Sequence, residues 1–64
     1  MPYTWVQRNY RVEVPVWGHD HDVIFDTADD AVRFARQWAV EDKVLVMVWS
    51  FAGAYYIARF DGRS

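Results

Sequence analysis

Two long stretches of the chain predict β-strands, and in the first of them apolar and polar residues alternate with the period of two that is typical of a strand with one buried face. The second stretch, Lys43 to Phe60, consists of two apolar runs around Ala52-Gly53 and predicts a β-hairpin. Gly53 would supply the positive φ of a two-residue turn. The first stretch, Arg8 to Trp17, has apolar residues on one face and polar residues or proline on the other: Tyr10, Val12, Val14 and Val16 against Arg11, Glu13 and Pro15.

A two-residue turn at Ala52-Gly53 sets which side chains of the hairpin share a face. One face has no charged residue and is therefore assigned to the core, with the pairs Phe51–Ala54, Trp49–Tyr56, Met47–Ala58 and Leu45–Phe60. The other face combines β-branched residues with polar ones, and it is expected to lie outside the core. Its members are Val44, Val46, Val48 and Ser50, opposite Asp61, Arg59, Ile57 and Tyr55.

Between the two stretches, the pattern predicts a short strand from Val23 to Phe25 and then a helix from Ala28 to Glu41. Thr27 is a good N-cap, and acidic residues in the first turn complement the positive end of the helix. Small side chains on the apolar stripe would let the helix lie close to a sheet. The stripe consists of Ala28, Ala31, Val32, Ala35, Trp38 and Ala39, flanked by Phe34.

These elements predict an α+β fold in one domain spanning residues 1–64. The order is β-β-α-β-β, with a mainly antiparallel four-stranded sheet and the helix on one face. Pro15 lacks an amide donor, so its strand is expected at a sheet edge or at a bulge, and Met1 to Gln7 could extend that strand. One helix covers only one sheet face. The other face is predicted to contact a partner or a second copy through Val46, Val48, Tyr55 and Ile57.

Composition narrows the possible functions. The chain has 64 residues and no cysteine, so its stability is expected to be marginal without oligomerisation or a partner. No apolar run approaches the roughly 20 residues of a membrane helix, and no signal-peptide pattern is present, which favours a soluble cytoplasmic protein without membrane contact. The net charge of −2 argues against direct nucleic-acid binding. The residues that favour such binding are Tyr55 and Arg59 on the outer hairpin face, where a base could stack.

Residues with catalytic or ligand chemistry are few. His19 and His21, with Asp20 and Asp22 between and after them, could bind zinc or a similar ion, but the same residues are common in polar turns, which is the favoured interpretation. Carboxylates near the helix start are explained by capping, and the serines have no recognisable base partner. We therefore expect no metal, no cofactor and no enzymatic activity.

The distribution of charge is more informative than its sum. Five aspartates fall within a segment of eleven residues that contains no lysine or arginine. If the turn before Val23 and the start of the helix lie at the same end of the domain, these carboxylates form an acidic patch that could dock on a basic groove. The predicted patch consists of Asp20, Asp22, Asp26, Asp29 and Asp30.

The acidic segment HDHDVIFDTADD, the small size and the pattern of one helix on a sheet resemble the small phage proteins called anti-CRISPR proteins. The resemblance is one of class and carries over no individual residue. It implies a phage-type inhibitor, a DNA mimic that blocks the nucleic-acid site of a bacterial defence complex. The leading hypothesis is thus a non-enzymatic protein-binding module, with a homodimer packed through its open sheet face, or a small His/Asp metal-binding protein, as alternatives.

Overall fold

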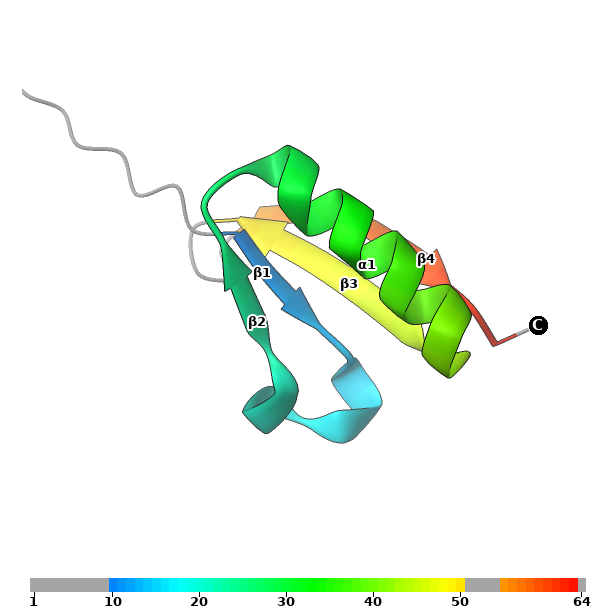
Figure 1. Cartoon of the computed structure of the whole chain (residues 1–64). Helices are drawn as coiled ribbons and strands as arrows, with labels where there is room; N and C mark the ends of the chain where they lie inside the picture. Colours follow the sequence, from blue (N-terminus) through cyan, green and yellow to red (C-terminus); the bar gives the residue numbers. More distant parts are fainter. Residues whose placement is uncertain (1–9, 51–54, 64) are drawn as a thin grey trace, which may run out of the picture.

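In the computed structural model, residues 10–50 and 55–63 are described, and they confirm the α+β class and the order β-β-α-β-β. The sheet is antiparallel with the strand order β2-β1-β3-β4, and α1 packs across one of its faces (Figure 1). The turn expected at Ala52-Gly53 and the expected extension at Met1 to Gln7 lie outside the described residues. The elements are β1 (Tyr10–Glu13), the 3-10 helices η1 (Pro15–Trp17) and η2 (His19–His21), β2 (Val23–Phe25), α1 (Ala28–Asp42), β3 (Leu45–Ser50) and β4 (Tyr55–Asp61).

The helix begins where the sequence predicts and ends one residue later. The Thr27 hydroxyl accepts a hydrogen bond of 3.2 Å from the Asp30 amide, which satisfies one of the free N–H groups of the first turn. At the other end, Lys43 takes a left-handed conformation with φ 55° and ψ 50°, and its amide donates to the Ala39 carbonyl. This geometry stops the helix and turns the chain directly into β3.

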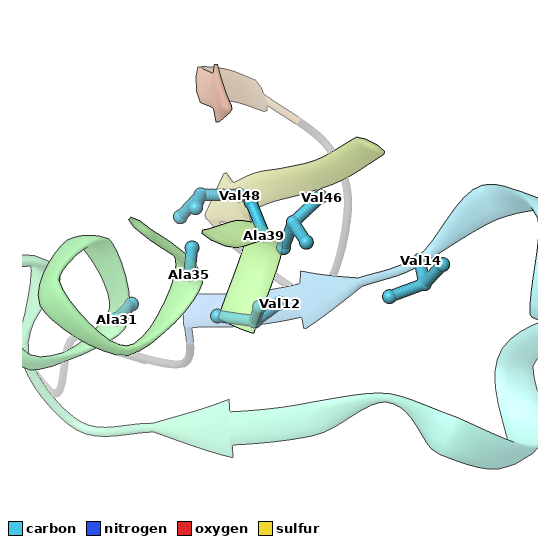
Figure 2. Packing of buried hydrophobic residues seen from close by; sticks show 7 residues of the cluster. All are labelled: Val12, Val14, Ala31, Ala35, Ala39, Val46 and Val48. Carbon is cyan, nitrogen blue, oxygen red and sulfur yellow. The ribbon is translucent and has the colours of Figure 1, made fainter. Parts of the chain in front are cut away.

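The core lies between α1 and the face of the sheet that the helix covers. Small side chains from both layers fill its centre: the helix contributes three alanines of the predicted stripe, and β1, the residue after it and β3 contribute valines (Figure 2). Such small residues let the backbone of the helix approach the sheet closely. The buried residues are Val12, Val14, Ala31, Ala35, Ala39, Val46 and Val48.

The assignment of the two faces of β3 is therefore the reverse of the prediction. Val46 and Val48 are 0% exposed beneath the helix, whereas Met47 and Trp49 point to the other side of the sheet and are partly exposed. The physical reason is size, since a helix that rests on alanines leaves space for valines but not for a row of large side chains. Pairing with β1 fixes the choice, because Val48 lies opposite Val12 on the buried face.

The hairpin register is also only partly as predicted. The pairs Trp49–Tyr56 and Ser50–Tyr55 are confirmed, but a register shift between Val48 and Trp49 displaces every pair further from the turn. Such a shift is a β-bulge, in which one strand carries an additional residue. Its consequence is that Phe60 lies opposite Val46 and packs against the core, while Leu45, Met47 and Val48 lie opposite Asp61, Arg59 and Ala58.

The first strand is shorter than the predicted stretch from Arg8 to Trp17. Its described part ends at Glu13, and Pro15 begins η1 instead of lying in an edge strand. A proline at the first position of a helical turn needs no hydrogen-bond partner for its nitrogen, and this explains the position. Because the chain leaves the sheet here, Val16 is 74% exposed and is not a core residue, and β1 occupies an interior place in the sheet.

Gly62 follows β4 and lies against the C-terminal part of α1, on the covered side of the sheet. Its amide donates a hydrogen bond of 3.0 Å to the Val44 carbonyl, which brings the residue against the C-terminal part of α1. A Cβ atom added at this position would overlap with the Ala39 carbonyl oxygen. Only glycine fits between the end of β4 and the helix.

Candidate binding surfaces

The sheet face opposite α1, here called the uncovered face, is not overlain by any helix among the described residues (Figure 1). Large apolar side chains occupy its middle, and the Trp49 and Tyr56 rings contact each other edge to face at 5.7 Å. Charged residues of β1 and β4 lie on either side of them. By strand register the uncovered face comprises Arg11, Glu13, Ile24, Leu45, Met47, Trp49, Tyr56, Arg59 and Asp61.

An ion cluster stands at the end of this face where β1 and β2 are connected. Arg11 donates from Nη2 to Glu13 Oε1 at 3.0 Å, and its Nε lies 3.7 Å from Asp22 Oδ2. His19 Nδ1 is 3.0 Å from the same Asp22 oxygen. Asp22 comes just before β2, so the alternation of the strand places its side chain on the side of Ile24 and Arg11. The cluster ties the η1–η2 connection to the sheet.

Three buried side-chain polar atoms of the described residues have no hydrogen-bond partner: Arg11 Nε, Asp22 Oδ1 and Trp49 Nε1. All three belong to the uncovered face or to the ion cluster at its end. An unsatisfied buried polar atom costs about 1–3 kcal/mol, so native proteins contain few of them. Among the described residues, these unpartnered atoms are concentrated on or beside one face of the sheet.

The predicted alternative of a metal site at His19 and His21 is not supported by the geometry. The two histidines lie in η2 and not on an extended strand, and the His21 ring packs against Trp17 at 5.4 Å. A different set, Glu13, His19 and Asp22, brings its ligand atoms within 4.8 Å of one another. The Arg11 guanidinium already lies 3.0 Å from Glu13 and 3.7 Å from Asp22, and a divalent ion would have to compete with that charge.

The five predicted aspartates do not form one acidic patch. Asp20 and Asp22 lie before β2, and the other three follow it, so β2 holds the two groups at opposite ends of the domain, more than about 10 Å apart along the strand (Figure 1). Asp22 is moreover only 12% exposed within the ion cluster. The remaining acidic group at the start of the helix consists of Asp26, Asp29 and Asp30, of which Asp30 faces Arg33 at 3.6 Å.

The four residues predicted on the open sheet face have different fates. Val46 and Val48 are buried and unavailable to a partner, because they face the helix. Tyr55 and Ile57 are 61% and 41% exposed, next to the bulge of β4. Among the described residues one sheet face has no helix over it, but strand register places Met47, Trp49 and their neighbours on that face and not the four predicted residues.

A row of aromatic rings runs from η1 across the helix to β2. This row was not predicted from the sequence. Centroid distances are 5.9 Å for Trp17–Trp38, 5.3 Å for Phe34–Trp38 and 5.1 Å for Phe25–Phe34. The spacing of Phe34 and Trp38 by one helical turn is visible in the sequence, but their neighbours come from other elements. Beside this row, α1 has a hollow of about 270 Å³ lined by Phe34, Gln37, Trp38, Glu41 and Asp42.

At the edge of the uncovered face, Arg63 folds back on Asp61. Its Nε and Nη2 donate to the carboxylate at 2.8 and 2.7 Å, and its backbone amide adds a bond of 3.0 Å. The side-chain hydrogen bonds from Arg63 are the main reason why the pKa of Asp61 lies well below its usual range, and they raise the pKa of Arg63 in turn. The lowered pKa keeps the Asp61 carboxylate ionised below the pH at which an ordinary aspartate takes up its proton.

The described part of the chain contains no helix that is both long and apolar enough to cross a membrane. The two candidate binding surfaces of the described residues are the uncovered face with its ion cluster and the hollow of α1 with its aromatic row. Comparisons with protein-family models, with curated proteins and with solved structures find no match to this chain.

Proposed function

We propose that this protein is a binding module that docks another protein on the uncovered face of its sheet. The observation that carries the proposal is the position of Arg11 Nε, Asp22 Oδ1 and Trp49 Nε1, the buried polar atoms without hydrogen-bond partners among the described residues, on or beside this face. A partner that supplies acceptors for Arg11 Nε and Trp49 Nε1 and a donor for Asp22 Oδ1 would remove a cost that the isolated protein bears.

The composition of the uncovered face fits this role. Trp and Tyr at the centre provide large contact areas with little loss of side-chain entropy, and charged residues at the rim set the register of a partner. Ile24 on β2 and Tyr56 on β4, the two edge strands, are 54% and 52% exposed, so large apolar side chains remain accessible at both edges of this face.

For the partner class, we propose the one that the anti-CRISPR resemblance implies, a nucleic-acid-binding effector complex that the protein would inhibit. The carboxylates at the helix start, Asp26, Asp29 and Asp30, are exposed and would contact its basic groove together with the rim of the uncovered face. This version of the DNA-mimic hypothesis needs three carboxylates at one end instead of a continuous patch of five.

Affinity capture from host extract with matched baits tests the proposal. Met47→Lys places a charge in the middle of the uncovered face, while Arg33→Ala changes an exposed residue of the helix layer. We expect proteins that are retained by the wild type and by Arg33→Ala to be lost with Met47→Lys. Retention by all three baits would overturn the use of this face. For the inhibitor version, the captured complex should lose nucleic-acid binding in proportion to bound protein.

A homodimer through the uncovered face is the second candidate. The charges of Arg11 and Glu13 on β1 and of Arg59 and Asp61 on β4 are of both signs, so two copies related by a two-fold axis could face each other without net repulsion. Light scattering after size exclusion distinguishes the two cases. A wild-type dimer that becomes a monomer with Met47→Lys would favour the second candidate over the first.

A further inference from the structure

The hollow on α1 combines two aromatic rings with two carboxylates. Phe34 and Trp38 follow one another by one helical turn, and their planes meet at 55°, so that they form two walls of an open trough. Glu41 and Asp42 stand at its C-terminal side, and Gln37 completes the lining. This surface lies in the helix layer, so what it binds goes beyond the function proposed for the uncovered face.

The walls of the trough are held in place by hydrogen bonds within the helix. The Trp38 indole N–H donates to Asp42 Oδ2 at 2.8 Å, which fixes the orientation of the ring and of the carboxylate together. Gln37 Nε2 donates to Glu41 Oε2 at 2.9 Å in the same way. On the far side, Trp17 packs edge to face on Trp38 and limits its movement. A site that is already ordered binds with a smaller entropic cost.

The charge in the trough is not balanced by a lining residue. No lysine or arginine lines the hollow, and the described arginines of the helix are engaged elsewhere, Arg33 beside Asp30 and Arg36 over the Phe60 ring at 5.6 Å. Two carboxylates thus stand next to two ring faces, which are themselves negative. The complementary ligand group is a cation that can also lie flat against a ring.

We propose that this trough binds an arginine side chain presented by a basic partner protein. A guanidinium stacks on Trp or Phe faces and donates two parallel hydrogen bonds to a carboxylate, whereas the compact ammonium of lysine does only one of these well. Asp42 Oδ1 and a second oxygen of Glu41 remain as acceptors beside the indole. The volume of about 270 Å³ is below the roughly 300–1,000 Å³ of small-molecule sites and suits a single side chain.

NMR titration of the full chain with N-acetyl-arginine amide tests the proposal, with N-acetyl-citrulline amide as the uncharged analogue of nearly the same shape. The indole N–H signal of Trp38, assigned by its loss in Trp38→Phe, reports on the trough. We expect a saturable shift with the arginine compound, and no shift with the citrulline compound. Weaker binding of N-acetyl-lysine amide, by about fivefold or more, would support stacking, since a factor of ten corresponds to only about 1.4 kcal/mol.

Two double variants with equal changes in charge separate a local site from general attraction. Glu41→Gln with Asp42→Asn removes the carboxylates but keeps acceptors for Gln37 and Trp38, and Asp26→Asn with Asp29→Asn removes two charges outside the trough. We expect about tenfold weaker arginine binding in the first and less than twofold change in the second. Equal weakening in both, or a Trp38 signal that does not move with arginine, would overturn the proposal. These results are independent of the function proposed for the uncovered face, which is tested separately with Met47→Lys.

Discussion

The two faces of the sheet are built from the same strands but differ in the size and polarity of their side chains. The fully buried centre of the covered face consists of valines against the alanines of α1, all at most 1% exposed, with larger rings such as Phe25 and Phe60 at its margin. The uncovered face has larger and chemically mixed side chains, with Arg11, Met47 and Trp49 half-buried and polar atoms left without partners. The difference shows that size, more than polarity, decides which face a close-packed helix covers. The face with the larger apolar residues is the one left for other contacts.

The largest expected effect comes from placing the same charge on adjacent residues of β3. Val48→Lys buries an ammonium between Val12 and Ala58 on the covered face, and it should cost more than about 4 kcal/mol. Since a domain of this size has roughly 3–10 kcal/mol of stability in total, the variant should be largely unfolded. Met47→Lys lies between Glu13 and Arg59, so attraction and repulsion nearly cancel, and we expect a change within about 1 kcal/mol.

Circular dichroism with urea unfolding measures both variants. A folded Val48→Lys protein with wild-type stability would contradict the assignment of the covered face. Equal destabilisation by the two substitutions would show that Met47 is as buried as Val48 in the isolated protein, and it would contradict the assignment of the uncovered face.

Adding a single methyl group to Gly62, at the end of the covered side, should destabilise the protein. Gly62→Ala places a Cβ atom against the Ala39 carbonyl, and we expect a loss of about 2–3 kcal/mol as β4 and α1 move apart. For a domain of this size that lowers Tm by roughly 10 °C or more. Gly18→Ala is a comparison without a steric contact, because no atom lies within 4 Å of the added Cβ atom, although φ 83° and ψ −177° are a conformation that only glycine adopts readily and that costs alanine about 1–3 kcal/mol. A Gly62→Ala protein with the wild-type Tm would disprove the close contact at Gly62.

Local signals in the sequence predict the helix and the short second strand well. Thr27, the alanine stripe and the bounds of Val23 to Phe25 are as expected, because capping and periodicity depend on residues close in the chain. The faces of β3 are not, since both of its sides are apolar and the choice depends on its pairing with β1. The bulge that places Phe60 on the covered side also leaves no local signal.

The candidate sites show the same limit. The ion cluster joins Arg11 to Asp22 across a connection whose two 3-10 turns are not visible in the pattern of residues. The acidic patch fails because β2 separates its two halves. For the trough, the sequence shows Phe34 and Trp38 one turn apart, but the contact of Trp17 with Trp38 depends on how η1 folds against the helix.

A smaller effect, of opposite sign, is expected where the helix that covers the sheet ends. Lys43 has φ 55°, a conformation that costs a non-glycine residue roughly 1–2 kcal/mol. Lys43→Gly should therefore stabilise the protein by up to about 1 kcal/mol, after the greater entropy of glycine in the unfolded chain is subtracted. Lys43→Ala retains the Cβ atom and should gain nothing. A stabilisation by both variants alike, measured by urea unfolding, would point to the charge of Lys43 and not to its backbone.

The smallest effect concerns the exposed ion pair at the rim of the uncovered face. Because Arg63 holds the pKa of Asp61 below its ordinary value of 3.8, the pair stabilises the folded protein above that pH, and the contribution is lost as the pH falls through the lower folded pKa. Both side chains are about half exposed, so solvent and salt screen the attraction. The Tm difference between the wild type and Asp61→Asn should be small at pH 7, shrink below pH 4 and decrease in high salt. A difference that grows on acidification would mean that Asp61 is held by its protonated form, against the geometry of its bonds with Arg63.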